Sequence, residues 1–351
     1  MRTAAAAVVK ATPWDRALRS AIATTVGLLA ALAATGPAGS ALVVIGAVCS
    51  VNADHSGGPT ARARRLAGAV GGGVAGILIG TAATVPGPRQ IVALAVAGLA
   101  AGLLGGWGPG RGLAGLKLMV LTSVSTGLPA TITPPHAVAL YLLGCAPMAA
   151  LLAAAWVIGE PGRRVLGPLP LEPVARPRPL TCPRRLAASL RLALCLAAAA
   201  ALAAAFHPEH ASWLLMTTAL VFRIDDVSVF HRVTHRAVGT IGGVLAATVL
   251  VRLPPGWATL TIALVVGALL PGLTDRAYAL HAALVSVIVL VLATPTAPSG
   301  PDSIAARLVD TLIACGLALL MGYVIWPDRR NRLTTVRPAA ERASAPSAPE
   351  R

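Results

Sequence analysis

Residues 186–206, LAASLRLALCLAAAAALAAAF, form an apolar run that is interrupted only by Ser189 and Arg191. An α-helix needs about 20 mostly apolar residues to cross the hydrocarbon core of a bilayer. The run is apolar on every face, whereas a strand of a membrane barrel alternates apolar and polar residues over about ten positions. Because a backbone in lipid must satisfy its own hydrogen bonds, the run predicts a membrane-spanning helix.

The rest of the chain repeats this pattern. Of the 351 residues, 56% are hydrophobic and 12% are charged, and the mean hydropathy is +0.75, which is outside the range of soluble domains. Short polar, Gly- or Pro-containing connections separate twelve apolar runs. These runs are residues 17–35, 40–51, 66–85, 90–107, 113–129, 137–158, 186–206, 211–222, 236–252, 257–272, 278–294 and 304–326. The sequence therefore predicts an all-α fold, a polytopic membrane helix bundle.

Topology explains the formal net charge of +16. When the connections are assigned alternately to the two sides of the membrane, all of the 29 Lys and Arg residues except Arg89, Arg252 and Arg307 fall on one side. This assignment places Lys117 with Arg111 in one connection. The positive-inside rule makes that side cytoplasmic and places both termini there. We therefore expect no nucleic-acid partner, and eleven further apolar runs argue against a cleaved signal peptide at 17–35.

Enzyme and metal signatures are absent from the sequence. It contains no GxxxxGK[ST], GxSxG or HExxH motif, and its five cysteines lack CxxC spacing. The Asn52/Asp54 and Asp225/Asp226 pairs approximate an aspartate-rich prenyltransferase site but lack its recurring carboxylates. His231 and His235 are spaced for a shared metal, yet no third ligand is evident. We therefore expect no catalytic activity, no cofactor and no metal.

The two halves of the chain are related by a shift of 171 positions. VNADHSGGPTARARRLAGAVGG at 51–72 aligns without gaps with FRIDDVSVFHRVTHRAVGTIGG at 222–243. The aligned identities are Asp54 with Asp225, Arg65 with Arg236, Gly68 with Gly239, Gly71 with Gly242, Gly72 with Gly243 and Ala75 with Ala246. This internal repeat predicts two membrane repeats of about six helices each, at 1–160 and 186–328. We expect a Pro/Arg-rich cytoplasmic linker at 161–185 to join them and a basic, disordered cytoplasmic tail to follow at 329–351.

Three segments of the second half resemble the fusaric acid resistance protein-like family of bacterial inner-membrane proteins. They are HASWLLMTTALVFRIDD at 210–226, HRAVGTIGGVLAA at 235–247 and RLVDTLIACGLALLMGYVIWPDRR at 307–330. The resemblance is strong over 186–330 and faint over 17–160. It implies a plasma-membrane transporter, because the family includes aromatic carboxylic acid exporters. Larger family members carry a cytoplasmic domain between their halves, where this chain has only the linker.

Two unusually short apolar segments point to a substrate site. In transporters built from repeats, short segments at matching positions are the best pointer to such a site, and here they are 40–55 and 211–226. Their roughly twelve apolar residues cover only about 18 Å of a core about 30 Å thick. Asp54 and Asp225, with Arg65 and Arg236, are therefore expected to approach the repeat interface from the cytoplasmic side.

The charged stretch 222–236 has two interpretations. In the first, residues 223–235 form an interfacial helix whose Ile224, Val227, Phe230 and Val233 or Val238 face lipid while its Arg and His side chains face water. In the second, Asp225 or Asp226 is a proton-coupling carboxylate, and Arg223 or Arg236 receives an anionic substrate. Two further candidates are an Arg307–Asp310 pair on the last span and a stacking residue, Trp213.

The function expected from these features is proton-coupled efflux of small aromatic or amphipathic carboxylic acids. The partners are membrane lipids and a small organic anion, and both a homo-oligomer and a periplasmic adaptor are compatible with this function. The alternative is a non-transporting membrane scaffold. In that case the basic linker and tail would bind a cytoplasmic partner or anionic lipid.

Overall fold

The structure is a computed structural model. It describes residues 14–34, 37–54, 58–107, 109–158, 181–206, 211–222, 229–250, 265, 266, 269, 278–293 and 301–325. The described residues form helices and short connections, with no strand among them. All of the predicted apolar runs except 257–272 coincide with a helix, and most of that run lies outside the described residues. The prediction of an all-α fold is confirmed for the described residues.

The helices begin where the sequence offers a good first turn. In the first half they are α2 (Trp14–Ala34), α3 (Pro37–Val51), α4 (Pro59–Thr81), α5 (Pro88–Gly105), α6 (Pro109–Ser125) and α7 (Pro134–Ile158). In the second half they are α8 (Cys182–Phe206), α9 (Ala211–Val221), α10 (Val229–Leu250), α12 (Tyr278–Ala293) and α13 (Pro301–Leu319), which continues as the π-helix η3 (Leu320–Ile325). Proline opens many of them because its fixed φ suits the first helical position and its missing N–H would have no partner there.

Four stretches of the described helices are long and apolar enough to cross a membrane. They are Pro88–Gly105, Pro134–Val157, Cys182–Phe206 and Leu308–Ile325. Shorter apolar helices comprise Ala41–Val51, Ser212–Val221 and Tyr278–Val287. Many large apolar side chains on the outward faces are exposed, including Leu194, Leu245 and Val324. Such faces suit contact with lipid tails rather than with water.

Glycines spaced four residues apart bring neighbouring helices into close contact. On α4, Gly72, Gly76 and Gly80 lie against the α6 carbonyls of Ala114, Leu118 and Thr122 in turn. A four-residue spacing returns to the same face of a helix at each turn, so these glycines form one continuous groove. A side chain in this groove would prevent the contact. The register also shows that α4 and α6 run in the same direction.

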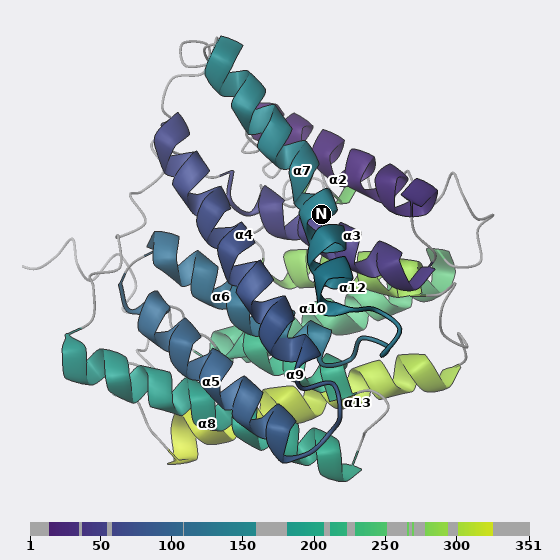
Figure 1. The fold of residues 1–351 in the computed structure, drawn as a ribbon. Helices are drawn as coiled ribbons and strands as arrows, with labels where there is room; N and C mark the ends of the chain where they lie inside the picture. The colour runs from purple at the N-terminus through teal and green to yellow at the C-terminus, as the bar shows by residue number, and fades with distance from the viewer. Residues whose placement is uncertain are drawn as a thin grey trace, which may run out of the picture.

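The same packing device recurs in the second half and between the halves. On α10, Gly239 and Gly243 lie against the α12 carbonyls of Ala279 and Ala283. On α5, Gly98 and Gly102 lie against Ala193 and Ser189 of α8, so these two helices run antiparallel. Figure 1 shows the teal α8 beside the blue α5, although they are far apart in sequence.

Helix contacts within one half have counterparts in the other. α3 packs against α2 and α7, as α9 packs against α8 and α13. α4 packs against α6 and α7, as α10 packs against α12 and α13. Between the halves, α6 contacts α9 and α12 contacts α3. A single buried apolar cluster includes residues of both halves, among them Leu121, Leu196 and Leu214.

Candidate functional site: a buried carboxylate among arginines

Asp54 lies just beyond the C-terminal end of α3, the short helix of the first half. α3 ends at Val51, and the backbone then turns, with the N–H of Ala53 donating to Ser50 O at 3.0 Å and that of Asp54 to Val51 O at 3.1 Å. The turn directs Asp54 inward, where its residue is only 1% exposed. A carboxylate buried to this degree requires charged or hydrogen-bonding partners.

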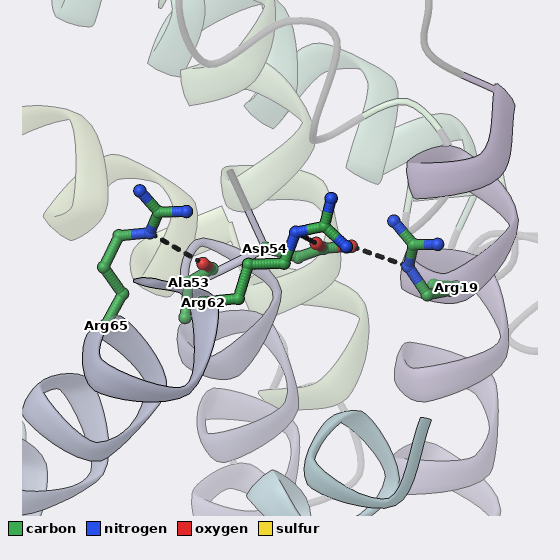
Figure 2. A network of polar contacts seen from close by, with 5 residues as sticks. All are labelled: Arg19, Ala53, Asp54, Arg62 and Arg65. Atoms are coloured by element: carbon green, nitrogen blue, oxygen red, sulfur yellow. Dashed lines mark hydrogen bonds and ion pairs between the residues drawn. The ribbon is translucent and has the colours of Figure 1, made fainter. Parts of the chain in front are cut away.

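Two arginines from different helices contact this carboxylate, as Figure 2 shows. Arg19 Nε of α2 donates a hydrogen bond to Asp54 Oδ2 at 2.9 Å. Arg62 Nε of α4 forms an ion pair with Asp54 Oδ1 at 3.5 Å. The cluster therefore connects α2, the end of α3 and the start of α4 through one carboxylate.

A third arginine adjoins the cluster without bonding the carboxylate. Arg65 lies one turn after Arg62 on α4, and its Nε donates to the backbone O of Ala53 at 3.3 Å. Three guanidinium groups thus surround one carboxylate, and the cluster has an excess of positive charge. Charge interactions are stronger in a partly buried site than in water. The arrangement can attract an organic anion and present guanidinium N–H groups to it.

Two of the residues that the sequence singled out, Asp54 and Arg65, lie close together in the structure. The two residues lie in one cluster, but the ion-pair partners of Asp54 are Arg19 and Arg62. From the sequence, Arg19 and Arg62 were predicted only to lie on the cytoplasmic side. A signal was available for Arg19, because it lies inside the apolar run 17–35 rather than in a connection.

The corresponding region of the second half departs from the interfacial-helix interpretation. α10 begins at Val229 and is continuous to Leu250, so residues 229–235 are its first turns. Phe230 is 53% exposed, as that interpretation requires, but Arg232 and Arg236 are buried rather than facing water. The expectation that the arginines of 223–235 face water is wrong for Arg232, because helix α10 turns this side chain toward its neighbours. Residues 223–228, which include Arg223, Ile224, Asp225, Asp226 and Val227, lie outside the described residues.

Arg236 keeps unused hydrogen-bonding capacity within the part of the chain that the structure describes. The residue is 2% exposed, and neither its Nε nor its Nη2 has a hydrogen-bond partner among the described residues. Nearby on α10, the rings of His231 and His235 stack with centroids 4.0 Å apart. The described residues contain no group of three side chains that could hold a metal ion.

The remaining predicted site residues lie away from the two arginine clusters. Trp213 is near the N-terminal end of α9 and packs against Val244 and Ala247 of α10. About nine residues of helix, or roughly 13 Å, separate Trp213 from Phe222 beside the charged stretch. Asp310 is buried on α13, but the structure does not describe the side chain of Arg307. The Arg307–Asp310 pair therefore stays a prediction.

One buried cation was misassigned by the sequence analysis. Lys117 was placed with Arg111 in a cytoplasmic connection, but it lies in the interior of helix α6 and is buried. The apolar run 113–129 contains Lys117 and could have shown this. An ionisable side chain inside a membrane helix suggests a functional role.

The second half of the chain also matches known proteins. Residues 196–321 match a family described as fusaric acid resistance protein-like. Inner membrane protein YccS of Escherichia coli (strain K12) is 28% identical over 124 residues, and the match covers 35% of this chain but only 17% of YccS. No solved structure matches the chain. These similarities, together with the four apolar helices that are long enough to cross a bilayer, show a membrane protein.

Proposed function

We propose that this protein is an inner-membrane exporter of small aromatic or amphipathic carboxylic acids and that a proton gradient drives it. One observation carries the proposal, the buried carboxylate of Asp54 between the guanidinium groups of Arg19 and Arg62. This cluster adjoins the end of the short helix α3. The match to the fusaric acid resistance protein-like family and to an inner membrane protein supports a membrane transport role.

Two parallel repeats would give such an exporter its central pathway, as in many secondary transporters. We infer two repeats of about six helices, with the linker and both termini in the cytoplasm. The shared helix contacts support the repeats, as do the close glycine contacts at matching positions, Gly72 and Gly243. Reporter fusions test the orientation. A fusion of alkaline phosphatase after residue 175 should be inactive, and periplasmic activity there would contradict it.

The cluster suggests how a proton and an organic anion can be exchanged. While ionised, Asp54 occupies the guanidinium groups of Arg19 and Arg62, and a substrate carboxylate must compete with it. Protonation of Asp54 removes its negative charge and releases these arginines for the substrate. Deprotonation restores the internal ion pairs and displaces the bound anion. Proton binding and anion binding are thus coupled through one pair of positive groups.

Transport by the full-length protein in proteoliposomes tests this function. With an imposed pH gradient, the wild type should move benzoate out of the compartment that represents the cytoplasm. Asp54→Asn should abolish the dependence on the gradient, because the amide cannot exchange a proton. Arg89→Gln removes an exposed charge at the start of α5 and is the matched control. Undiminished coupled efflux in Asp54→Asn would reject the proton-exchange mechanism, and no efflux of any aromatic acid by the wild type would reject the exporter.

The stretch 223–226 is tested in the same assay. If Asp225 and Asp226 carry protons, an Asp225→Asn, Asp226→Asn double variant should also lose gradient-driven efflux while it inserts normally. Normal coupled efflux by this variant would restrict the coupling role to Asp54. Comparing the growth of deletion and overexpressing cells on a panel of aromatic acids would then identify the substrates.

A second candidate function is a membrane scaffold that binds anionic lipid, and one feature favours it. The exposed ring of Trp107 lies between two guanidinium groups, with Arg111 at 4.3 Å and Arg185 at 4.8 Å from its centroid. Aromatic and basic side chains together suit the headgroup region of the cytoplasmic leaflet. Strong binding to vesicles of phosphatidylglycerol without any measurable efflux would favour this function.

A further inference from the structure

Lys117 is a buried cation in the middle of a membrane helix. α6 comprises 17 residues, and Lys117 is about eight residues, or roughly 12 Å, from its first residue. The residue is 5% exposed, and its neighbours on the helix include the buried Leu118, Met119 and Leu121. Burial of an ammonium group among such side chains destabilises a bundle unless an anion accompanies it.

The helices around Lys117 supply no such anion. α6 packs mainly against α4, α5 and α9, and none of these three helices contains Asp or Glu. The sequence has no acidic residue from position 55 to position 159. Among the described residues, the ion pairs do not include Lys117. Its charge instead acts on the thiol of Cys145, an uncharged residue of α7.

The C-terminal end of α9 lies at the same depth as Lys117. Gly127, just after α6, contacts Ser212 at the start of α9, and the two helices run in opposite directions. Lys117 precedes Gly127 by ten residues, and Phe222 follows Ser212 by ten residues. Because both helices rise about 1.5 Å per residue, these two side chains are at similar depth. Phe222 is buried, and the guanidinium of Arg191 lies 5.3 Å from its ring centroid.

We propose that Lys117 binds the carboxylate of an aromatic monocarboxylic acid inside the bundle and that the ring of the acid lies beside Phe222. The choice of ligand class rests on the proposed export function. The positive ammonium group balances the negative charge of the carboxylate, and Phe222 supplies an aromatic surface at similar depth. Asp54 and its arginines lie near the start of α4, whereas Lys117 lies more than two turns inside α6. The Lys117 site is therefore a second anion-binding site, deeper in the bundle.

Equilibrium binding of benzoate to the purified full-length protein tests the proposal, with benzamide as the neutral analogue. The wild type should bind benzoate and not benzamide. Lys117→Met should weaken benzoate binding at least tenfold, whereas Lys117→Arg should remain within a few-fold of the wild type. Arg89→Gln, which removes an exposed positive charge at the start of α5, should bind as the wild type does. Melting temperatures without ligand provide a second measurement, and Lys117→Met should equal or exceed the wild type because it removes a buried charge.

Each outcome bears on the proposal. Failure of the wild type to bind benzoate, equal binding of benzamide, or unchanged benzoate binding in Lys117→Met would overturn it. A lower melting temperature of ligand-free Lys117→Met would indicate a structural lysine and would also contradict it. The efflux assay is independent of these results. If benzoate binding depends on Lys117 but the protein shows no gradient-driven efflux, the Lys117 site is supported and the exporter is rejected. If the protein shows gradient-driven efflux but benzoate binding does not depend on Lys117, the exporter is supported and the Lys117 site is rejected.

Discussion

The two halves of the chain place an arginine at the same point of a glycine-rich helix, but in different surroundings. In the first half, Arg65 donates a hydrogen bond to Ala53 O, and the neighbouring Asp54 is paired with Arg19 and Arg62. In the second half, Arg236 is more deeply buried, and two of its nitrogens have no hydrogen-bond partner within the described residues. The first half thus carries a carboxylate with two ion pairs, and the second half carries a buried arginine with unused donors.

This difference indicates a division between structure and function. The two ion pairs of Asp54 stabilise the contact between their helices, whereas a buried arginine with unused donors lowers stability unless a ligand or another segment engages it. Several helix contacts of the described residues recur in both halves, whereas the polar groups differ. The halves should therefore respond alike to changes in packing and differently to changes in charge.

The largest effect is expected at the paired glycines of α4 and α10. Gly72 and Gly243 lie against the backbones of α6 and α12, whereas a side chain at their neighbours Gly71 and Gly242 meets open space. Gly72→Val and Gly243→Val should each force two helices apart and destabilise the protein by about 3 kcal/mol. Gly71→Val and Gly242→Val should be nearly neutral. Yield and melting temperature in detergent measure both pairs, and a severe effect in only one half would break the correspondence of the repeats.

The next largest effect is expected at Asp54, the carboxylate that forms two ion pairs in the first half. Asp54→Asn removes both ion pairs and leaves two partly buried guanidinium groups uncompensated, so it should cost about 2 kcal/mol of stability. Replacing Arg19 with Met in the same protein should recover part of this loss, because one of the uncompensated charges is removed. Melting temperatures of the single and double variants give the coupling. Strictly additive losses would show that Arg19 and Asp54 are not coupled.

Much of the fold could be predicted from the sequence because membrane helices are set by local properties. Apolar runs and Gly or Pro boundaries located nearly all the described helices, and the shift of 171 positions paired Gly72 with Gly243 before any packing was known. Helix starts extended further than expected into polar residues, as at Pro59 and Val229. Hydropathy measures only how apolar a segment is. It therefore does not predict helical turns whose arginines face neighbouring helices.

The site was less predictable because it depends on contacts between distant helices. The sequence identified Asp54 and Arg65 but could not identify Arg19 as the carboxylate's partner, since 35 positions separate Arg19 and Asp54. The positive-inside rule treats every cation as exposed, and this assumption misplaced Lys117. Charge counting assigns residues to a side of the membrane, whereas burial depends on which face of the helix carries them.

A smaller effect should separate the two equivalent arginines. Arg65→Met removes one hydrogen bond, to Ala53 O, and should destabilise the protein by about 1 kcal/mol. Arg236→Met removes a buried charge with unused donors and should be neutral or stabilising, yet it should reduce benzoate efflux more than Arg65→Met does. Thermal melting and efflux of the two variants are compared in the same preparation. Equal destabilisation by both would show that Arg236 has a structural partner and would remove the contrast between the halves.

The smallest effect is expected at Tyr141, a further difference between the halves. Tyr141 of α7 is fully buried over Gly73, and its hydroxyl donates a hydrogen bond to Ala69 O at 3.1 Å. The equivalent positions in the second half are Leu312, which is exposed, and Val244, whose side chain leaves no comparable space.

Tyr141→Phe should cost at most about 1 kcal/mol, because Ala69 O is also a helix carbonyl and keeps its backbone donor, so little unsatisfied polarity remains. Leu312→Ala, the control in the second half, should have almost no effect, because an exposed side chain loses little packing. A melting curve for each variant measures the pair. If Tyr141→Phe were as damaging as Asp54→Asn, the hydroxyl would belong to a larger buried network, and the polar difference between the halves would extend from the arginine cluster into the core of the first half.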